Sequence, residues 1–112
     1  MDTYTSIQVL RGCAYRIAAN RNEKPSSAMT AFSKLFIQPK RDWKRDGAPR
    51  IGWKRGELVE VIQAKTRSEA MSELGDVAYY LAQTPLAVTL LLFPREVLKG
   101  AVIKFQARAF QQ

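Results

Sequence analysis

The chain has no histidine and only one cysteine among its 112 residues. Without histidine, imidazole acid–base catalysis and histidine ligation of a metal are excluded. Cys13 alone cannot form an internal disulfide or a cysteine zinc cluster, and its apolar surroundings predict core packing. The longest apolar run, residues 86–93, is too short to span a bilayer, and the N-terminus lacks a signal-peptide region. We therefore expect one cytoplasmic domain, from a bacterium or a phage-infected cell.

Acidic residues are also scarce. The chain has 10 of them against 18 lysines and arginines, a net charge of +8. Such an excess favours an anionic partner: a nucleotide, a nucleic acid, an acidic protein or a membrane surface. Five of the ten acids lie between residues 57 and 76, whereas the rest of the sequence is strongly basic. The short acidic stretch is therefore the feature that most needs an explanation.

Apolar residues recur at helical spacing over four long segments, which predicts helices at 3–20, 53–65, 67–84 and 95–110. Ser26 or Ser27 is expected to cap a further short helix through Phe36. No alternating strand pattern of useful length is present. The sequence therefore predicts an all-α protein in which short connections join antiparallel helices into a bundle.

Local signals refine these helices. Thr66 to Glu69 has the spacing of a capping box, which starts the third long helix sharply. Gly75 lies inside that helix at a cost of about 1 kcal/mol relative to alanine, which predicts close approach by another backbone or by a ligand. Residues 86–93 are apolar nearly all round, so we expect them to be buried or to form an oligomer contact.

Residues 38–52 differ in character, with two prolines, two glycines and many basic residues. One interpretation is a solvated loop that places a single aromatic side chain in the core. The other is a contact surface for substrate or nucleic acid, in which lysine and arginine meet phosphates while Trp43 stacks on a base.

The acidic stretch contains two couplets, Glu57-Leu-Val-Glu60 and Glu73-Leu-Gly-Asp76. Residues three apart share a helix face, so two antiparallel helices would bring four carboxylates together. Such a group repels itself unless a hard cation such as Mg²⁺ or Mn²⁺ lies within it. The alternative is a solvated acidic face balanced by neighbouring cations, namely Lys54, Lys65 or Arg67.

The same segments resemble a known family. "ELVEVIQA" followed by "SELGDVAYYL" is similar to the MazG-type all-α nucleoside triphosphate pyrophosphohydrolases, whose signature is Glu-Glu-x-x-Glu, a spacer and Glu-x-x-Asp. "VLKGAVIKFQARAF" is similar to the last core helix of that family. The resemblance covers residues 53–110 of a single domain spanning residues 1–112, and it leaves a basic loop at 38–52 outside.

The resemblance implies a magnesium-dependent enzyme that converts nucleoside triphosphates to monophosphates and pyrophosphate, with Mn²⁺ as a substitute metal. It assigns metal ligation and catalysis to Glu57, Glu60, Glu73 and Asp76, one of which would instead orient the attacking water. Glu60 and Asp76 are expected to be the least replaceable. Family members commonly form dimers or tetramers, so a homo-oligomer is expected.

Substrate binding is expected on two further pairs of residues. Lys104 and Arg108 match phosphate-contacting positions of the family, although two solvated basic residues would give the same pattern. Trp53 and Lys54 begin the acidic helix, and Trp53 would either border the base pocket or pack in the core.

Two departures keep other readings open. The first glutamate of the family's leading pair is Gly56 here, and the polar residues expected before Lys104 are Val102 and Ile103. A member that keeps the fold but has lost efficient hydrolysis would account for both. A different reading is a small basic regulator of phage type that docks on nucleic acid or on an acidic protein through residues 40–55. No recognised DNA-reading motif accompanies that segment.

Overall fold

The computed structural model describes residues 1–36, 38–43, 47 and 49–111, and for 38–43 and 49–52 it describes the backbone alone. The described chain is mostly helical, as predicted. Its elements in order are α1 (Thr3–Asn20), α2 (Ala28–Ser33), β1 (Gln38–Trp43), β2 (Pro49–Lys54), α3 (Glu57–Gln63), α4 (Arg67–Ala82), the 3-10 helix η1 (Pro85–Leu92) and α5 (Arg95–Ala109).

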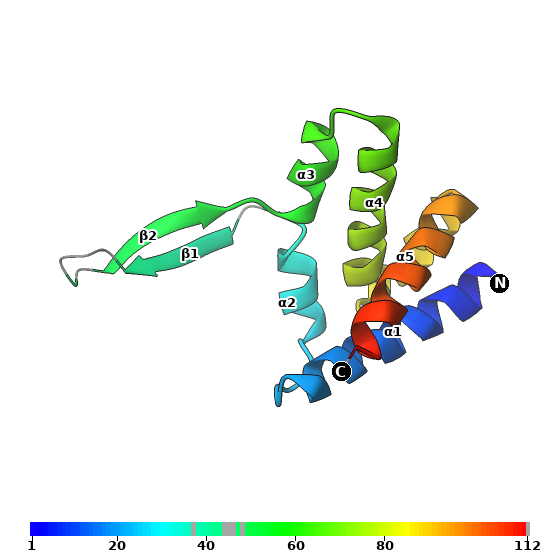
Figure 1. Cartoon of the computed structure of the whole chain (residues 1–112), viewed down its shortest axis with the longest axis horizontal. Coiled ribbons are helices and arrows are strands. Elements are labelled where there is room, and N and C mark those ends of the chain that lie inside the picture. The colour runs from blue at the N-terminus through cyan, green and yellow to red at the C-terminus, as the bar shows by residue number, and fades with distance from the viewer. Residues whose placement is uncertain (37, 44–46, 48, 112) are drawn as a thin grey trace.

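The core lies where α1, α4, η1 and α5 meet. Helices α1 and α5 lie alongside each other and α4 crosses them, so that the two chain ends belong to neighbouring helices (Figure 1). Leu10 of α1 and Leu90 of η1 are fully buried in this core. Cys13 is buried beside them, which confirms its predicted packing role. The helical periodicity of the sequence thus reflects one shared apolar centre.

Side-chain caps define where the helices begin. Ser27 caps α2, since its hydroxyl accepts a hydrogen bond from Thr30 N at 3.2 Å. The Thr66 hydroxyl accepts from Glu69 N at 3.1 Å, which confirms the predicted start of α4. The Glu69 carboxylate reaches back to Lys65 N at 3.2 Å, one residue before the cap. These bonds satisfy amide groups that have no partner within the helix.

Gly75 lies where α4 approaches α5 closely. A Cβ atom at this position would lie 3.4 Å from the Cβ of Ala101. The predicted close approach is therefore that of a neighbouring helix backbone, and two small residues allow it.

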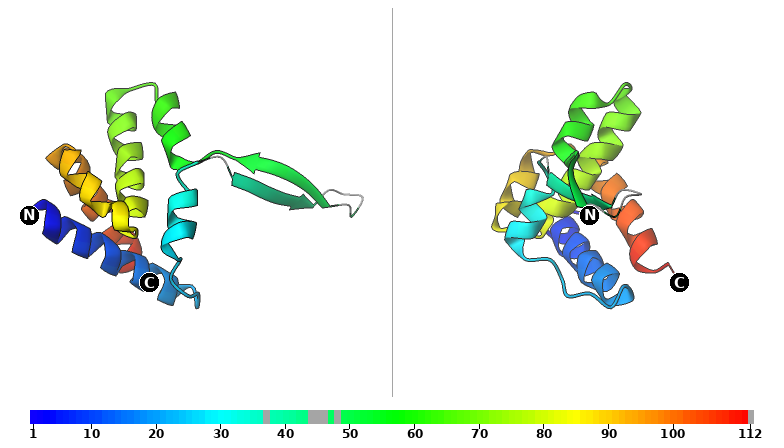
Figure 2. Two further views of the ribbon diagram at one scale, coloured as in Figure 1. Left: turned by 180° about the vertical axis from the view of Figure 1, so that it is seen from behind. Right: turned by 90° about the vertical axis from the view of Figure 1, so that its left-hand side faces the viewer.

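Residues 38–43 and 49–54 form the two strands of a β-hairpin, and the prediction of a loop with no strand was wrong. The two strands pair antiparallel from Gln38↔Lys54 to Trp43↔Pro49. The hairpin extends away from the helices, which Figure 1 and the left view of Figure 2 show. The two strands pair with each other. Their sequence is rich in charged residues, proline and glycine and has no alternating apolar pattern, so its periodicity did not predict strands. The side chain of Trp43 lies outside what the structure describes.

Helix α3 begins at Glu57, four residues later than predicted, because β2 extends to Lys54. Gly56 precedes it and packs against the backbone of Phe36: a Cβ on Gly56 would lie 1.9 Å from the Phe36 carbonyl oxygen. Glu57 N donates to Lys34 O at 3.1 Å, and Leu58 N to Leu35 O at 3.0 Å. These contacts join the end of α2 to the start of α3 and close the base of the hairpin.

The apolar stripes are only partly buried. Ile62 of α3 is 81% exposed, and α3 has no fully buried residue. In η1, Ala87 and Leu90 are buried while Leu91 and Leu92 are exposed. Within the described part of the chain, the helices are too short or too polar to cross a membrane.

Candidate functional site

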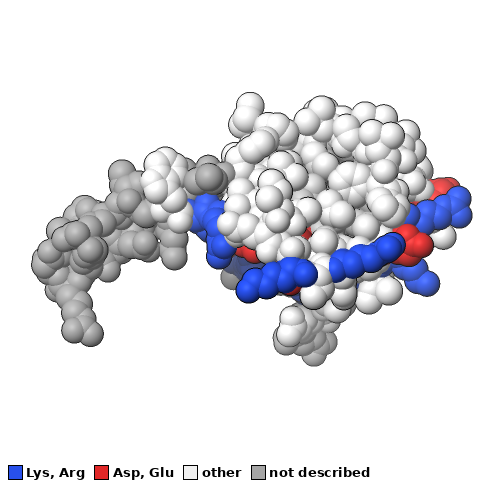
Figure 3. Space-filling view, turned by 90° about the horizontal axis from the view of Figure 1, so that it is seen from above, with Lys and Arg blue, Asp and Glu red and all other residues white. Residues whose placement is uncertain are grey.

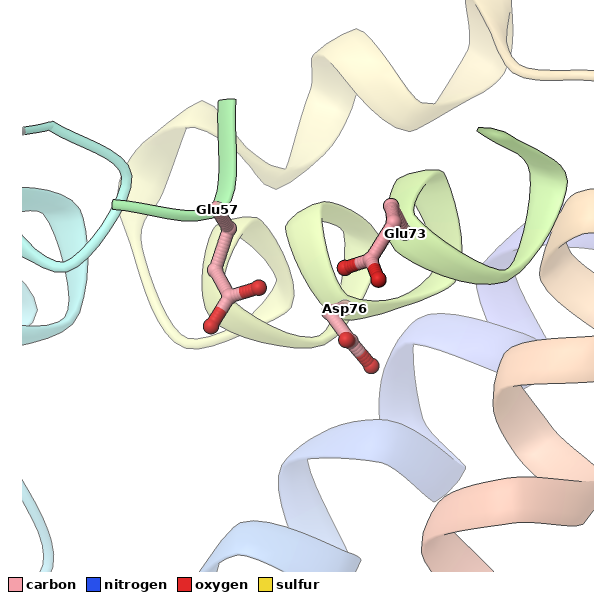
Figure 4. A group of neighbouring side chains, drawn as sticks. All are labelled: Glu57, Glu73 and Asp76. Atoms are coloured by element: carbon pink, nitrogen blue, oxygen red, sulfur yellow. The ribbon is translucent and has the colours of Figure 1, made fainter. Parts of the chain in front are cut away.

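Helices α3 and α4 run side by side in opposite directions and bring the two acidic couplets together (Figure 1). Glu57 begins α3, and Glu73 and Asp76 are one turn apart on α4. Each offers a carboxylate oxygen, and these oxygens all lie within 4.8 Å of one another. Figure 4 shows the three side chains converging on one space between the helices. All three are half-buried, so water only partly screens their charges.

Burial and mutual repulsion raise the pKa of two of these carboxyls. Partial burial is the main cause for Glu57, followed by the charges of Asp76, Glu73 and Glu60, while Lys54 acts in the opposite direction. The pKa of Glu73 is also raised, first by burial and then by Asp76 and Glu60. The folded protein therefore resists carrying full negative charge here, and a bound cation would relieve that cost.

Glu60 is the fourth residue of the predicted metal site, and it is not a member of this close group. It lies one turn further along α3 and is half-buried. Its charge nevertheless raises the pKa of both Glu57 and Glu73. Glu60 thus lies at the edge of the group, near enough for an electrostatic effect on it.

Lys104 of α5 supplies a positive charge to the group. Its ammonium group donates to Asp76 Oδ1 at 2.8 Å and to the backbone oxygen and hydroxyl of Ser72 at 3.0 Å each. The charge of Lys104 also acts to lower the pKa of Glu73, against the larger effect of burial. The structure therefore brings together Lys104 and the acidic group, 28 residues apart in sequence.

Arg108 lies one turn beyond Lys104 and faces a different space. Its guanidinium is 5.0 Å from the centre of the Phe105 ring, which stacks on Tyr79 with ring centres 3.8 Å apart. A cavity of about 120 Å³ opens beside this stack, between α1, α2, α4 and α5. Arg21, Lys24, Lys34 and Arg108 are its basic residues, and Glu23 is its acidic one.

Tyr80 connects the cavity to the acidic group. Its side chain lines the cavity, with the Lys34 ammonium 5.6 Å from the ring centre. The pKa of Tyr80 is raised by burial first and then by the charges of Glu57 and Asp76, while Arg108 and Arg21 act in the opposite direction. The charges of the acidic group and those of the basic cavity therefore act on Tyr80 in opposite directions.

Sequence reasoning missed three of these residues: Arg21, Lys34 and Tyr80. A signal existed for Tyr80, since it follows Asp76 by four residues and so lies on the same face of α4. No comparable signal marked Arg21 and Lys34, because their place beside Arg108 depends on how α1 and α2 pack.

The remaining predicted residues, Trp53 and Lys54, lie at the end of β2. Trp53 is 72% exposed, so the alternative in which it packs in the core was wrong, and its place beside a base pocket stays a prediction. Lys54 is exposed, yet its charge lowers the pKa of Glu57 against the larger effect of burial. From above, acidic atoms are visible between basic side chains beside the root of the hairpin (Figure 3). A ligand approaching there meets both signs of charge.

The donor set fits a hard divalent cation. Three carboxylates offer only oxygen atoms, the ligand type that Mg²⁺ and Mn²⁺ prefer, and nitrogen or sulfur ligands are absent from the group. The pKa values of Glu57 and Glu73 are raised first by burial and then by the neighbouring carboxylates, and a bound cation would offset both effects. The site could therefore hold such an ion between α3 and α4.

Comparisons with known proteins add no relative: no protein family, curated protein or solved structure matches this chain. The resemblance to the MazG-type enzymes thus depends on the motif residues, and the function it implies is a proposal.

Proposed function

We propose that this protein is a magnesium-dependent nucleoside triphosphate pyrophosphohydrolase of the MazG type. One observation carries the proposal: Glu57, Glu73 and Asp76 converge within 4.8 Å from two different helices, at the positions that the family motif assigns to metal ligands. A solvated acidic face would spread its charges apart, since each ionised neighbour makes the next one costlier.

The roles of the residues follow from their positions. Glu57, Glu73 and Asp76 would hold the ion, with Mg²⁺ preferred and Mn²⁺ able to substitute. When bound, the metal supplies positive charge to the phosphate oxygens and lowers the pKa of the attacking water. Glu60, at the edge of the group, would orient that water and accept its proton.

The cationic side chains would receive the phosphates. Lys104 is within hydrogen-bond distance of Asp76, so a phosphate held at the acidic group would meet its ammonium. Arg108, Arg21 and Lys34 would attract the rest of the anionic substrate towards the aromatic cavity. Trp53 and Lys54, at the foot of the hairpin, would border the open side.

A homodimer would cover apolar residues that the single chain leaves exposed. Val88, Leu91 and Leu92 are exposed apolar residues of η1, with the last 86% exposed, and Met1 and Tyr4 are exposed on and before α1. Met1, Tyr4 and Leu91 line one cavity, and large apolar residues gathered on a surface favour self-association. We propose that a second copy covers them and that the helices of both copies form the antiparallel bundle. Light scattering at micromolar concentration should give twice the mass of the chain, and a strictly monomeric mass would refute this part.

A second candidate, a member of the family without efficient hydrolysis, is favoured by one observation. Gly56 stands where the family has a glutamate, and the Phe36 backbone leaves no room for a side chain there. Such a protein would still bind Mg²⁺ at the three converging carboxylates, but it would sequester nucleotides instead of cleaving them.

The test is pyrophosphate release from a panel of ribonucleoside and deoxyribonucleoside triphosphates, with and without millimolar Mg²⁺. Asp76→Asn is the matched variant, because it removes one ligand charge and keeps the side-chain size. Release that needs Mg²⁺ and disappears in Asp76→Asn supports the enzyme. Magnesium-dependent thermal stabilisation without release supports the degenerate member. The absence of both, with or without nucleotide, would overturn the metal site and the proposal with it.

A further inference from the structure

Positive charge is concentrated in the hairpin. Residues 38–55 hold seven of the 18 basic residues and two of the 10 acidic ones, and so carry five of the eight net positive charges. Both tryptophans of the chain, Trp43 and Trp53, lie in the same stretch. Neither the acidic group nor the cavity beside it accounts for this combination of charge and aromatic residues.

The hairpin is placed to meet a partner. Its strands pair with each other for six residues each, a length of about 20 Å, and extend away from the helices (Figures 1 and 2). Its base is fixed, because Glu57 N and Leu58 N bond to the end of α2 and Gly56 packs against Phe36. The arm is therefore held at its root by the helical body.

The strand register sorts the residues of the hairpin. Cross-strand partners share one face of an antiparallel pair, and consecutive residues alternate between faces. Trp43 and Trp53 therefore belong to one face, together with Arg41. Lys40, Arg50 and Lys54 belong to the other, together with Asp42, the cross-strand partner of Arg50. Trp53 is 72% exposed, so an aromatic surface is available on the face of Arg41, and most of the positive charge lies on the opposite face of the same two-stranded ribbon.

We propose that the hairpin binds single-stranded nucleic acid. A strand that passes around the narrow ribbon would meet Arg41 beside the tryptophans and the basic residues of the opposite face through its phosphates, while its bases stack on the tryptophan face. Stacking requires bases that are not already paired in a duplex, which favours a single strand over a double helix. An acidic protein would complement the positive charge but would not account for the two tryptophans. The inference does not depend on hydrolysis at the acidic group.

The experiment measures binding of a fluorescent oligothymidylate of about 12 nucleotides to the full chain by anisotropy, over a range of NaCl concentrations. The variant Lys40→Gln/Arg41→Gln/Arg50→Gln should weaken binding by about tenfold or more at low salt. It should also lower the slope of log affinity against log salt by about 2, since each phosphate contact on a single strand contributes about 0.7.

The matched control removes three charges from exposed positions in the helical body, Arg67→Gln/Arg95→Gln/Lys99→Gln. It should change affinity by less than about threefold, because these charges lie far from the bound strand and salt screens their attraction. Trp53→Ala should weaken binding by about five- to 100-fold and leave the salt slope unchanged, because stacking releases no counterions.

Several results would overturn the inference. Equal losses from the two triple variants would mean attraction by net charge alone. Binding of polyglutamate as tight as that of the oligonucleotide would point to an acidic protein partner. Equally tight binding of a duplex with no effect of Trp53→Ala would exclude base stacking, and absence of binding at low salt would exclude the site altogether.

Discussion

The seam between α3 and α4 and the neighbouring β-hairpin both concentrate charge, yet they hold it in opposite ways. The seam crowds half-buried carboxylates within 4.8 Å, and crowding and burial raise the pKa of Glu57 and Glu73. The hairpin carries its positive charges along an extended arm (Figure 1). Charges crowded in a low-dielectric site resist ionisation and favour one compact counter-ion, whereas extended charges are screened and favour a long polyanion.

This contrast implies different sensitivities to substitution. A metal site depends on each ligand, because all of its carboxylates would bind the same ion. On a polyelectrolyte surface, many contacts each contribute a small part of the binding free energy, so removing a single charge weakens binding only slightly. The two regions can therefore be separated by experiment, starting with the change that should have the largest effect.

Glu57→Gln should abolish magnesium-dependent hydrolysis, on the order of 100-fold or more, because metal-derived charge stabilisation contributes several kcal/mol to the barrier. The variant without metal should be as stable as the parent or more stable, since a repelling carboxylate is lost. Melting temperatures with and without Mg²⁺ would show a metal-induced rise in the parent alone. Glu96→Gln, an exposed acid on α5, serves as the control and should keep the rise. A rise of equal size in Glu57→Gln would refute the seam as the metal site.

Leu90→Ala should destabilise the helical body by about 2–5 kcal/mol, because the side chain is fully buried and its removal leaves a cavity. Replacing residues 38–54 with a short glycine–serine turn should change the free energy of unfolding by less than about 1 kcal/mol, since loop length alone has a small entropic effect. Urea denaturation measures both. A hairpin deletion as damaging as Leu90→Ala would mean that the arm is part of the core.

Gly56→Ala should destabilise the protein by about 1–3 kcal/mol, the usual cost of forcing extra atoms into a packed site. The added Cβ would lie 1.9 Å from the Phe36 carbonyl oxygen, so the junction between α2 and α3 must shift. Gly12→Ala is the matched control, since a Cβ there meets nothing within 4 Å, and it should stabilise α1 slightly. If Gly56→Ala were as stable as the parent, the tight junction at the root of the hairpin would be wrong.

The smallest expected effect is a dependence on pH. The raised pKa values of Glu57 and Glu73 mean that the folded, metal-free protein binds protons more tightly than the unfolded chain. Their contribution to stability is therefore present below the ordinary value of 4.5 and is lost as the pH rises through the raised values. The stabilising effect of Glu57→Gln should accordingly be largest at neutral pH and fade towards pH 4.5. Melting temperatures of parent and variant across this range test it, and a difference that does not change with pH would remove repulsion as the cause.

Much of the helical structure could be read from local signals. Ser27 and Thr66 cap the helices where the sequence placed them, and the apolar spacing of α1 matches its bounds. The hairpin could not be read this way, because its sequence has no alternating apolar pattern and its prolines and glycines are typical of loops. The late start of α3 was missed for a related reason: β2 takes up Trp53 and Lys54, which continue the helical pattern in the sequence alone.

What the sequence determined by itself is local: the helices, their caps, and the spacing that sets Glu73 and Asp76 on one face of α4. These features depend on residues three or four apart, whose geometry in a helix is fixed. Only the tertiary structure decided which charges meet. The couplets predicted four carboxylates together, but the packing left Glu60 outside the close group. It also brought Lys104 to Asp76, and Arg21 and Lys34 to the cavity beside Arg108. Such contacts between distant residues depend on how the helices pack, and neither periodicity nor spacing encodes that.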